Sequence, residues 1–145
     1  LHLTLSFIGE VDGRDAAMID DALAGILAPG FTLQLHGVGQ FGTGKLTRAH
    51  ALWAAARPNP ALEHLQRKVD TAIRRVGTAQ DAHKFTPHVT VARLRHHEPE
   101  KVLEWLTYHA LYTSVEFEVR AFHLYSSLLT SDGSVYRIER DYELE

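Results

Sequence analysis

Hydrophobic and polar residues alternate in several short stretches of the chain, which is the pattern of half-buried β-strands. The first stretch is residues 1–8, and others are residues 31–37, 87–94 and 115–125. A polar loop is predicted at residues 78–84, directly before the third stretch. Two further apolar stretches flank the turn sequence SDGS near the end of the chain, and together they predict a β-hairpin.

Apolar residues spaced three and four apart predict helices in three other segments. These segments are residues 14–28, which precede a Pro-Gly pair, residues 60–76, and residues 97–111. The short run at residues 50–56 fits either a strand or a short helix, and residues 38–46 form a Gly-rich loop in this interpretation. The mixture of strands and helices predicts an α+β fold.

The two halves of the chain resemble each other when one is shifted by 86 residues. The shift places His2 on His88, and it places residues 31–41 on residues 117–127. We interpret the match as two lobes related by a pseudo-twofold axis, each an antiparallel sheet with helices on the outside. We expect each lobe to present its histidine strand toward the other across a groove, in one bilobal domain covering residues 1–145.

The repeated feature is His-x-Thr with aliphatic residues in the x positions, at His2-Thr4 and again at His88-Thr90. Side chains two apart on a strand share a face, so each histidine lies beside its threonine. One neutral imidazole can take a proton from an attacking oxygen, and a protonated one can give a proton to the leaving oxygen. Threonine hydroxyls can donate to the phosphate oxygens on which charge accumulates. This pattern favours phosphoryl chemistry that needs no metal, although each copy alone also fits simple sheet packing.

Three neighbouring residues extend this candidate site. Arg93 ends the second motif strand, where it can bind a phosphate through two hydrogen bonds or stand as a solvated charge. Phe85 precedes the second motif and can stack on a nucleobase or pack in the core. Phe41, in the predicted Gly-rich loop, can likewise stack on a nucleobase or pack in the core, and its sequence context gives less support for a role in the site.

Composition narrows the possible functions. The chain has 145 residues, of which 45% are hydrophobic and 23% charged, and it has no apolar run long enough to cross a bilayer. The formal charge of −3 argues against a protein that coats nucleic acid, although a few local cations can still form a phosphate site. Cysteine is absent, which excludes disulfides and a thiol nucleophile. We expect a cytoplasmic monomer that needs no cofactor.

Several motifs together resemble the two-histidine phosphoesterases, and most closely the RNA 2′,3′-cyclic phosphodiesterases, also called 2′-5′ RNA ligases. The matching segments are HLTLSFIGEV, GVGQF, LW, FTPHVTVAR and GSVYRIERDYEL. The resemblance implies hydrolysis of 2′,3′-cyclic phosphates, in RNA or in nucleotides, to 2′-phosphates, together with the reverse joining to a 5′-hydroxyl. It implies no cofactor, and it implies RNA ends or small nucleotides as binding partners.

The resemblance also implies individual roles. His2 would be the general acid toward the 3′-oxygen and His88 the base toward water, while Thr4, Thr90 and Arg93 would contact the phosphate. Members of this family begin with a strand and a helix before the first motif. We therefore expect that residues precede Leu1 in the complete protein.

Two alternatives stay open at this stage. A non-catalytic module that binds RNA ends or nucleotides would use the same groove, and a histidine metal site would make activity depend on a metal. The adjacent His96 and His97 can ligate a metal, but no third ligand stands at a useful spacing, so exposed loop positions are expected. The basic run at residues 67–75 reads as the solvated face of a helix, or as a patch for an RNA backbone.

Overall fold

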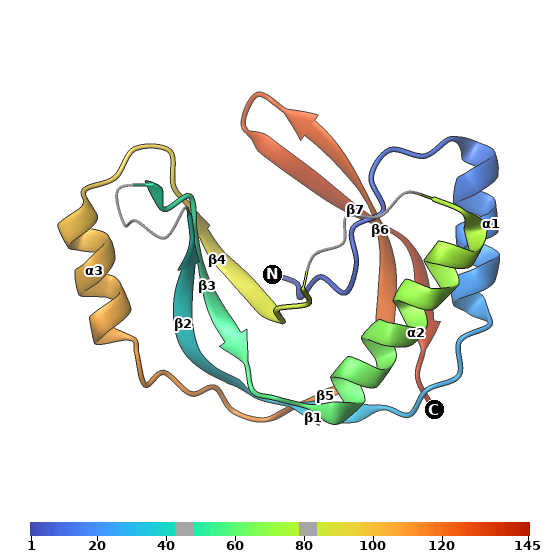
Figure 1. Ribbon diagram of the computed structural model, residues 1–145, viewed down its shortest axis with the longest axis horizontal. Helices are drawn as coiled ribbons and strands as arrows, with labels where there is room; N and C mark the ends of the chain where they lie inside the picture. Colours follow the sequence, from blue (N-terminus) through green and yellow to red (C-terminus); the bar gives the residue numbers. More distant parts are fainter. Residues whose placement is uncertain (43–47, 79–83) are drawn as a thin grey trace. The chain divides into compact units, whose positions relative to one another are not determined.

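The computed structural model describes residues 1–42, 48–78 and 84–145, and it divides the chain into two compact units (Figure 1). Both units combine antiparallel strands with helices, so the fold is α+β, as predicted. The first unit comprises Leu1–Leu5, Thr32–Asn59 and His83–Phe117. The second unit comprises Ser6–Phe31, Pro60–Ala82 and Glu118–Glu145.

The first unit is a three-stranded antiparallel sheet with one helix on one face (Figure 1). Its strand order is β2 (Leu35–Phe41), β3 (Ala51–Ala56) and β4 (His88–Arg93). Helix α3 (Pro99–Tyr108) buries Val102 against the sheet residue Leu52. One face of this sheet is therefore committed to the helix, and the other is available for a site.

The second unit contains the predicted hairpin, formed by β6 (Ala121–Thr130) and β7 (Gly133–Glu143). Helix α1 (Gly13–Ala24) packs against α2 (Pro60–Val76) and also contacts β7. The buried residues of α2 follow the three- and four-residue spacing that predicted it. The core of the unit takes apolar side chains from both helices and both strands: Ile19, Leu23, Leu62, Leu65, Val69, Ile73, Phe122 and Tyr142.

The internal repeat is visible in the starting points of the elements. Helices α1 and α3 begin 86 residues apart, and so do the three-residue strands β1 (Phe31–Leu33) and β5 (Phe117–Val119), which form a two-stranded sheet. Strands β2 and β6 begin 86 residues apart as well, each after a break of one residue. One pair of helices and two pairs of strands share the same offset, which chance does not explain. The halves of the chain are therefore structural repeats.

The units are not the two halves of the chain, however. The first unit joins strands β2 and β3 of the first repeat to β4 and α3 of the second, whereas the second unit joins α1 to β6 and β7. The expectation that each lobe carries its own histidine strand is therefore corrected. Both His-x-Thr motifs belong to the first unit, where Leu3 forms an antiparallel bridge with Val89 of β4.

Several predicted boundaries also differ. Residues 1–8 were predicted as a strand, but only Leu3 forms a β-bridge and the backbone bends at Leu5, so pairing stops there. Helix α1 ends at Ala24, with Gly25 as its C-cap, rather than at residue 28, and residues 50–56 contain the strand β3. Strand β2 takes in part of the predicted Gly-rich loop, up to Phe41.

Parts of two predicted loops, residues 43–46 and 79–83, lie outside the described residues. Within the described part of the chain, none of the helices has the length and hydrophobicity needed to span a membrane.

One polar contact ties α1 to β7 inside the second unit. The Tyr142 hydroxyl donates to Asp20 Oδ1 at 2.6 Å, and Arg140 Nε donates to Asp20 Oδ2 at 3.0 Å. The Tyr142 hydrogen bond, followed by Arg140, holds the pKa of Asp20 below its ordinary value of 3.8. This contact is therefore complete wherever Asp20 is ionised.

We predict that Tyr142→Phe lowers the thermal midpoint by a few degrees at neutral pH, because Asp20 loses a donor. Since the pKa of Asp20 is depressed in the folded state, the loss is full above about pH 4 and shrinks at lower pH, as Asp20 becomes protonated. Thermal unfolding followed by circular dichroism from pH 3 to pH 7 measures this, with the exposed Tyr108→Phe as control. A loss that does not change with pH would contradict the role of Asp20.

Candidate active site

The second His-x-Thr motif lies on the sheet face that α3 does not cover. Residues directly opposite each other in an antiparallel pair share a face. Thr90 is opposite Trp53, which is in turn opposite Gly39, and His88 shares the face of Thr90. Leu52, adjacent to Trp53 in β3, faces the other way, toward α3. The second motif thus lies on the face of the first unit that α3 does not cover.

A β-bulge in β4 changes which side chains reach this face. Trp53 pairs with Thr90, but the preceding residue of β3, Leu52, pairs with Ala92. Strand β4 therefore advances by two residues where β3 advances by one, and Val91 is the extra residue. Val91 is 47% exposed, although alternation predicted it as an apolar anchor of the strand.

The bulge brings Arg93 to the histidine face. Arg93 follows His88 by five residues, and in a regular strand an odd spacing points two side chains to opposite faces. The extra residue shifts the alternation by one. Arg93 then pairs with Ala51 and lies on the same face as His88.

The first motif reaches the same place through one antiparallel bridge, between Leu3 and Val89. His2 and Thr4 flank Leu3, so their side chains leave the segment on the side opposite to that of Leu3. The bridge is the contact that aligns the N-terminal segment with β4.

The register of this bridge sets the geometry of the four motif residues. In an antiparallel pair, the residue before one partner lies opposite the residue after the other. His2 therefore lies opposite Thr90, and Thr4 lies opposite His88. The two histidines are diagonal neighbours on one face, and such pairs have Cα atoms roughly 7–8 Å apart.

The ring of His88 is held from several sides. Its Nδ1 lies 2.6 Å from the carbonyl oxygen of Thr86. A carbonyl only accepts, so Nδ1 carries the hydrogen and Nε2 of the neutral ring is left with a free lone pair. Phe41 meets the imidazole edge-on, with ring centroids 4.8 Å apart, and the Trp53 ring lies at 5.7 Å. This arrangement suits a general base that acts through Nε2.

His2 has a different electrostatic setting. Burial lowers the pKa of His2, and the positive charges of Arg93 and His88 lower it further. The neutral imidazole is therefore favoured when no anion is bound.

We call His2, Thr4, His88, Thr90 and Arg93 the histidine cluster. The other predicted positions lie outside this cluster or at its margin. Phe85 is half-buried in the segment before β4. Phe41, which had less support from the sequence, contacts His88 directly, and Trp53 was part of the matching LW segment but was not predicted as a site residue. A glycine within a strand, as at Gly39, is a signal that could have suggested a large side chain packed across it.

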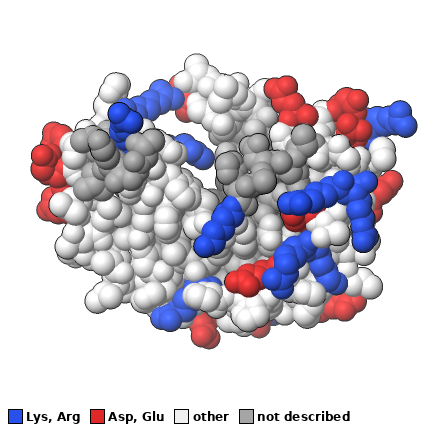
Figure 2. Space-filling model, in the orientation of Figure 1, with Lys and Arg blue, Asp and Glu red and all other residues white. Residues whose placement is uncertain are grey.

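The remaining candidates lie elsewhere. His96 is exposed as expected, whereas His97 is half-buried. The described residues contain no group of three or more His, Cys, Asp or Glu side chains able to hold a metal. The basic run at residues 67–75 lies on α2, where Arg74 pairs with Asp70 at 2.9 Å. Figure 2 shows Lys and Arg side chains close to Asp and Glu, which supports the interpretation as a solvated helix face.

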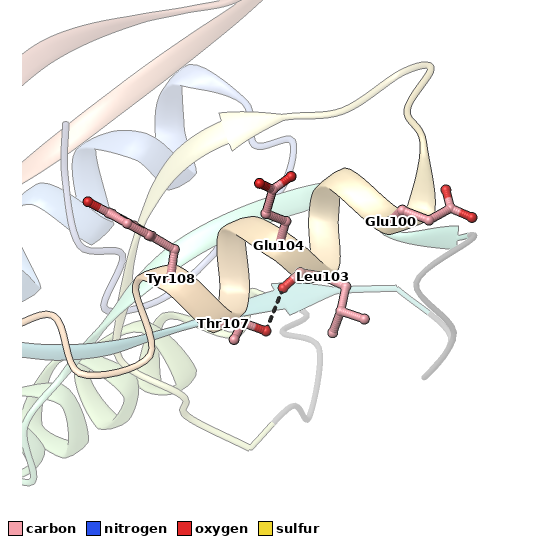
Figure 3. Close-up of a pocket in the computed structure, with 5 residues that line it drawn as sticks. All are labelled: Glu100, Leu103, Glu104, Thr107 and Tyr108. Atoms are coloured by element: carbon pink, nitrogen blue, oxygen red, sulfur yellow. Dashed lines mark hydrogen bonds between the residues drawn. The ribbon is translucent and has the colours of Figure 1, made fainter.

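A shallow pocket is present on the outer side of α3 (Figure 3). It is lined by residues of that helix alone: Glu100, Leu103, Glu104, Thr107 and Tyr108. The Thr107 hydroxyl donates to the Leu103 carbonyl at 2.8 Å within the helix. No motif residue takes part, so this pocket is separate from the histidine cluster.

Known proteins resemble the chain along nearly its whole length. A curated RNA 2′,3′-cyclic phosphodiesterase from Archaeoglobus fulgidus is 31% identical over 143 residues, which is 99% of this chain and 79% of the relative. One from Thermotoga maritima is 28% identical, covering 100% and 76%. Among solved structures, E. coli LigT complexed with 3′-AMP matches with a TM-score of 0.74 at 27% identity, covering 99% of this chain and 76% of that one.

The model of one protein family agrees with these likenesses. The model described as the 2′-5′ RNA ligase superfamily matches residues 1–130, which include both His-x-Thr motifs and the bulged strand β4. The chain therefore belongs to the 2′-5′ RNA ligase superfamily.

Proposed function

We propose that this chain hydrolyses 2′,3′-cyclic phosphates, at RNA ends or in small nucleotides, to 2′-phosphates. The observation that carries the proposal is the register of residues 1–5 on β4, which makes His2 and His88 diagonal neighbours on one face. The relatives named RNA 2′,3′-cyclic phosphodiesterase support the same reaction.

In this reaction His88 is the general base. Its free Nε2 takes a proton from water, whose oxygen attacks the phosphorus. The imidazolium that forms keeps its Nδ1–H bond to the Thr86 carbonyl, which stabilises the positive charge. Because the hydrogen bond fixes which nitrogen is free, the base is ready before substrate arrives.

His2 is the general acid. It gives its proton to the 3′-oxygen as the bond from phosphorus to that oxygen breaks, which leaves the phosphate on the 2′-oxygen. The acid must be protonated, whereas the environment of His2 lowers its pKa in the free protein. A bound anionic phosphate offsets the charges of Arg93 and His88 and so favours the protonated form.

The remaining motif residues hold the phosphate. Thr4 and Thr90 donate to its non-bridging oxygens, and Arg93 binds it with two hydrogen bonds. Phe85 stacks on the nucleobase. If a 5′-hydroxyl takes the place of water, the same base and acid produce a 2′-5′ linkage. Both motifs lie in one compact unit of the chain, so the proposed site needs no residue from a second copy, and we propose a monomer. The lack of cysteine suits a reducing cytoplasm.

We predict that the protein converts an RNA with a 2′,3′-cyclic phosphate end into a 2′-phosphate end, in the presence of EDTA. Acid–base catalysis by two histidines requires no metal. Product analysis that separates 2′- from 3′-phosphates measures the outcome. Activity abolished by EDTA would point to a metal site instead, and binding without turnover would point to a non-catalytic module.

We predict that His2→Ala and His88→Ala each reduce turnover by about 10²–10⁴-fold, because each removes one proton transfer. Initial rates on 2′,3′-cyclic AMP measure the loss, and circular dichroism checks folding. His96→Ala, which removes an exposed histidine, serves as the matched control and should keep wild-type rates. Rates near wild type for either motif variant would refute its assignment.

We predict that Arg93→Gln raises the pKa of His2 in the free protein, because it removes a positive charge that lowers it. NMR titration of the His2 ring proton between pH 4 and pH 8 reports the shift, and added phosphate should raise the pKa of His2 in the wild type. Arg95→Gln is the control, since Arg95 is exposed and is not among the charges acting on His2. An unchanged titration in Arg93→Gln would place Arg93 away from the site.

A further inference from the structure

We propose that Trp53 is a positioning residue for His88, which it holds in the orientation that presents Nε2 to the phosphate. The inference rests on the proposed role of His88 as general base. It concerns a residue that does not itself touch the reacting atoms and that carries none of the motif chemistry.

The indole ring of Trp53 lies across the backbone of Gly39 on the neighbouring strand. A Cβ atom added at Gly39 would lie 2.3 to 2.8 Å from three atoms of the indole six-membered ring. Glycine weakens the interior of a strand, and such a glycine commonly marks a close packing contact. Strand β2 thus leaves room for one large ring at the position opposite Trp53.

Three aromatic rings, one from each strand of the sheet, then pack together. The Trp53 ring centroid is 5.2 Å from that of Phe41 and 5.7 Å from that of His88, and Phe41 stands edge-on to His88. The terminal torsion of a histidine is broad and close to twofold, so an unrestrained ring can turn over and exchange its two nitrogens. The neighbouring rings restrict that rotation.

The Thr86 carbonyl supplies the other restraint. Pro87 limits Thr86 to an extended backbone, and the Ala56 amide donates to the Pro87 carbonyl at 3.0 Å. The carbonyl that accepts from His88 Nδ1 is therefore fixed in place. In Ser-His-Asp sites an ionised carboxylate orients the histidine. Here a neutral carbonyl fixes the tautomer, and the aromatic rings share the task of fixing the orientation.

The indole nitrogen of Trp53 takes no part in orienting His88. Among the described residues, Trp53 Nε1 is buried and has no hydrogen-bond partner. A buried tryptophan N–H usually finds a partner, so an unsatisfied one carries a cost. The ring surface of Trp53, and not its N–H group, is the part that meets Gly39, Phe41 and His88.

The test compares Trp53→Leu with Trp53→Phe, and with Trp105→Leu as the matched control. Trp105 is on α3 and packs on the other face of the same sheet. We expect Trp53→Leu to lower kcat by about 10–100-fold, the scale of a small misplacement of a catalytic group, with KM nearly unchanged. Trp53→Phe should restore most of kcat, and Trp105→Leu should keep it.

A second readout does not depend on activity. Nitrogen-15 NMR of the histidine side chains distinguishes a ring protonated at Nδ1 from one protonated at Nε2. We expect the neutral His88 of the wild type to show Nδ1–H alone, and that of Trp53→Leu to show both forms. If the wild type proves inactive on cyclic phosphates, the proposed function fails, while this readout still tests the positioning.

Gly39→Ala provides an independent variant, because its methyl group displaces the indole without removing it. It should reproduce the loss of kcat and the mixed tautomers of Trp53→Leu. Gly13→Ala, where an added Cβ meets no atom within 4 Å, should have no effect. If Trp53→Leu does not fold, Gly39→Ala and Trp53→Phe decide the question.

Two results would overturn the inference. One is a Trp53→Leu or Gly39→Ala protein in which kcat and the His88 tautomer both match the wild type. The other is an equal loss of kcat in Trp53→Leu and Trp105→Leu with the tautomer unchanged, which would show that Trp53 acts only through the stability of the sheet.

Discussion

The site depends on the register of one backbone pairing, the bridge between Leu3 and Val89. A slip of one residue in a β pairing turns every side chain to the opposite face. Such a slip would point His2 away from His88 and bring an aliphatic residue in its place. The apolar positions of both motifs are therefore part of the chemistry, because they decide which side of each segment carries the imidazole.

The bulge in β4 likewise decides which face of the sheet carries the positive charge of Arg93. Sequence periodicity correctly predicted β4, α2 and the terminal hairpin, because each keeps a regular two-residue or three-to-four-residue pattern. A bulge leaves no such pattern, since it replaces alternation by one residue that belongs to neither face. The side of the sheet occupied by Arg93, and the exposure of Val91, could therefore only be learned from the pairing with β3.

The sequence also could not predict that each unit combines elements of both repeats. The 86-residue offset shows which segments are equivalent, and the starting points of α1 and α3 follow it. It does not show whether a helix packs on the strands of its own repeat or on those of the other, because both choices satisfy the same hydrophobic pattern. Trp53 was missed similarly: its importance lies in what it contacts across two strands, at Gly39 and His88.

These features together describe how the site balances charge. Without substrate, His2 favours its neutral form beside Arg93, so the cluster avoids holding several positive charges together. An anionic phosphate then supplies the charge that makes protonated His2 favourable, which couples formation of the acid to binding. In the proposed reaction, one turnover would leave His2 deprotonated and His88 protonated. From the bound state with protonated His2 to the product state with protonated His88, the charge that the two rings hold would thus be unchanged. His88 would then give its proton to water, and His2 would regain a proton when the next phosphate binds.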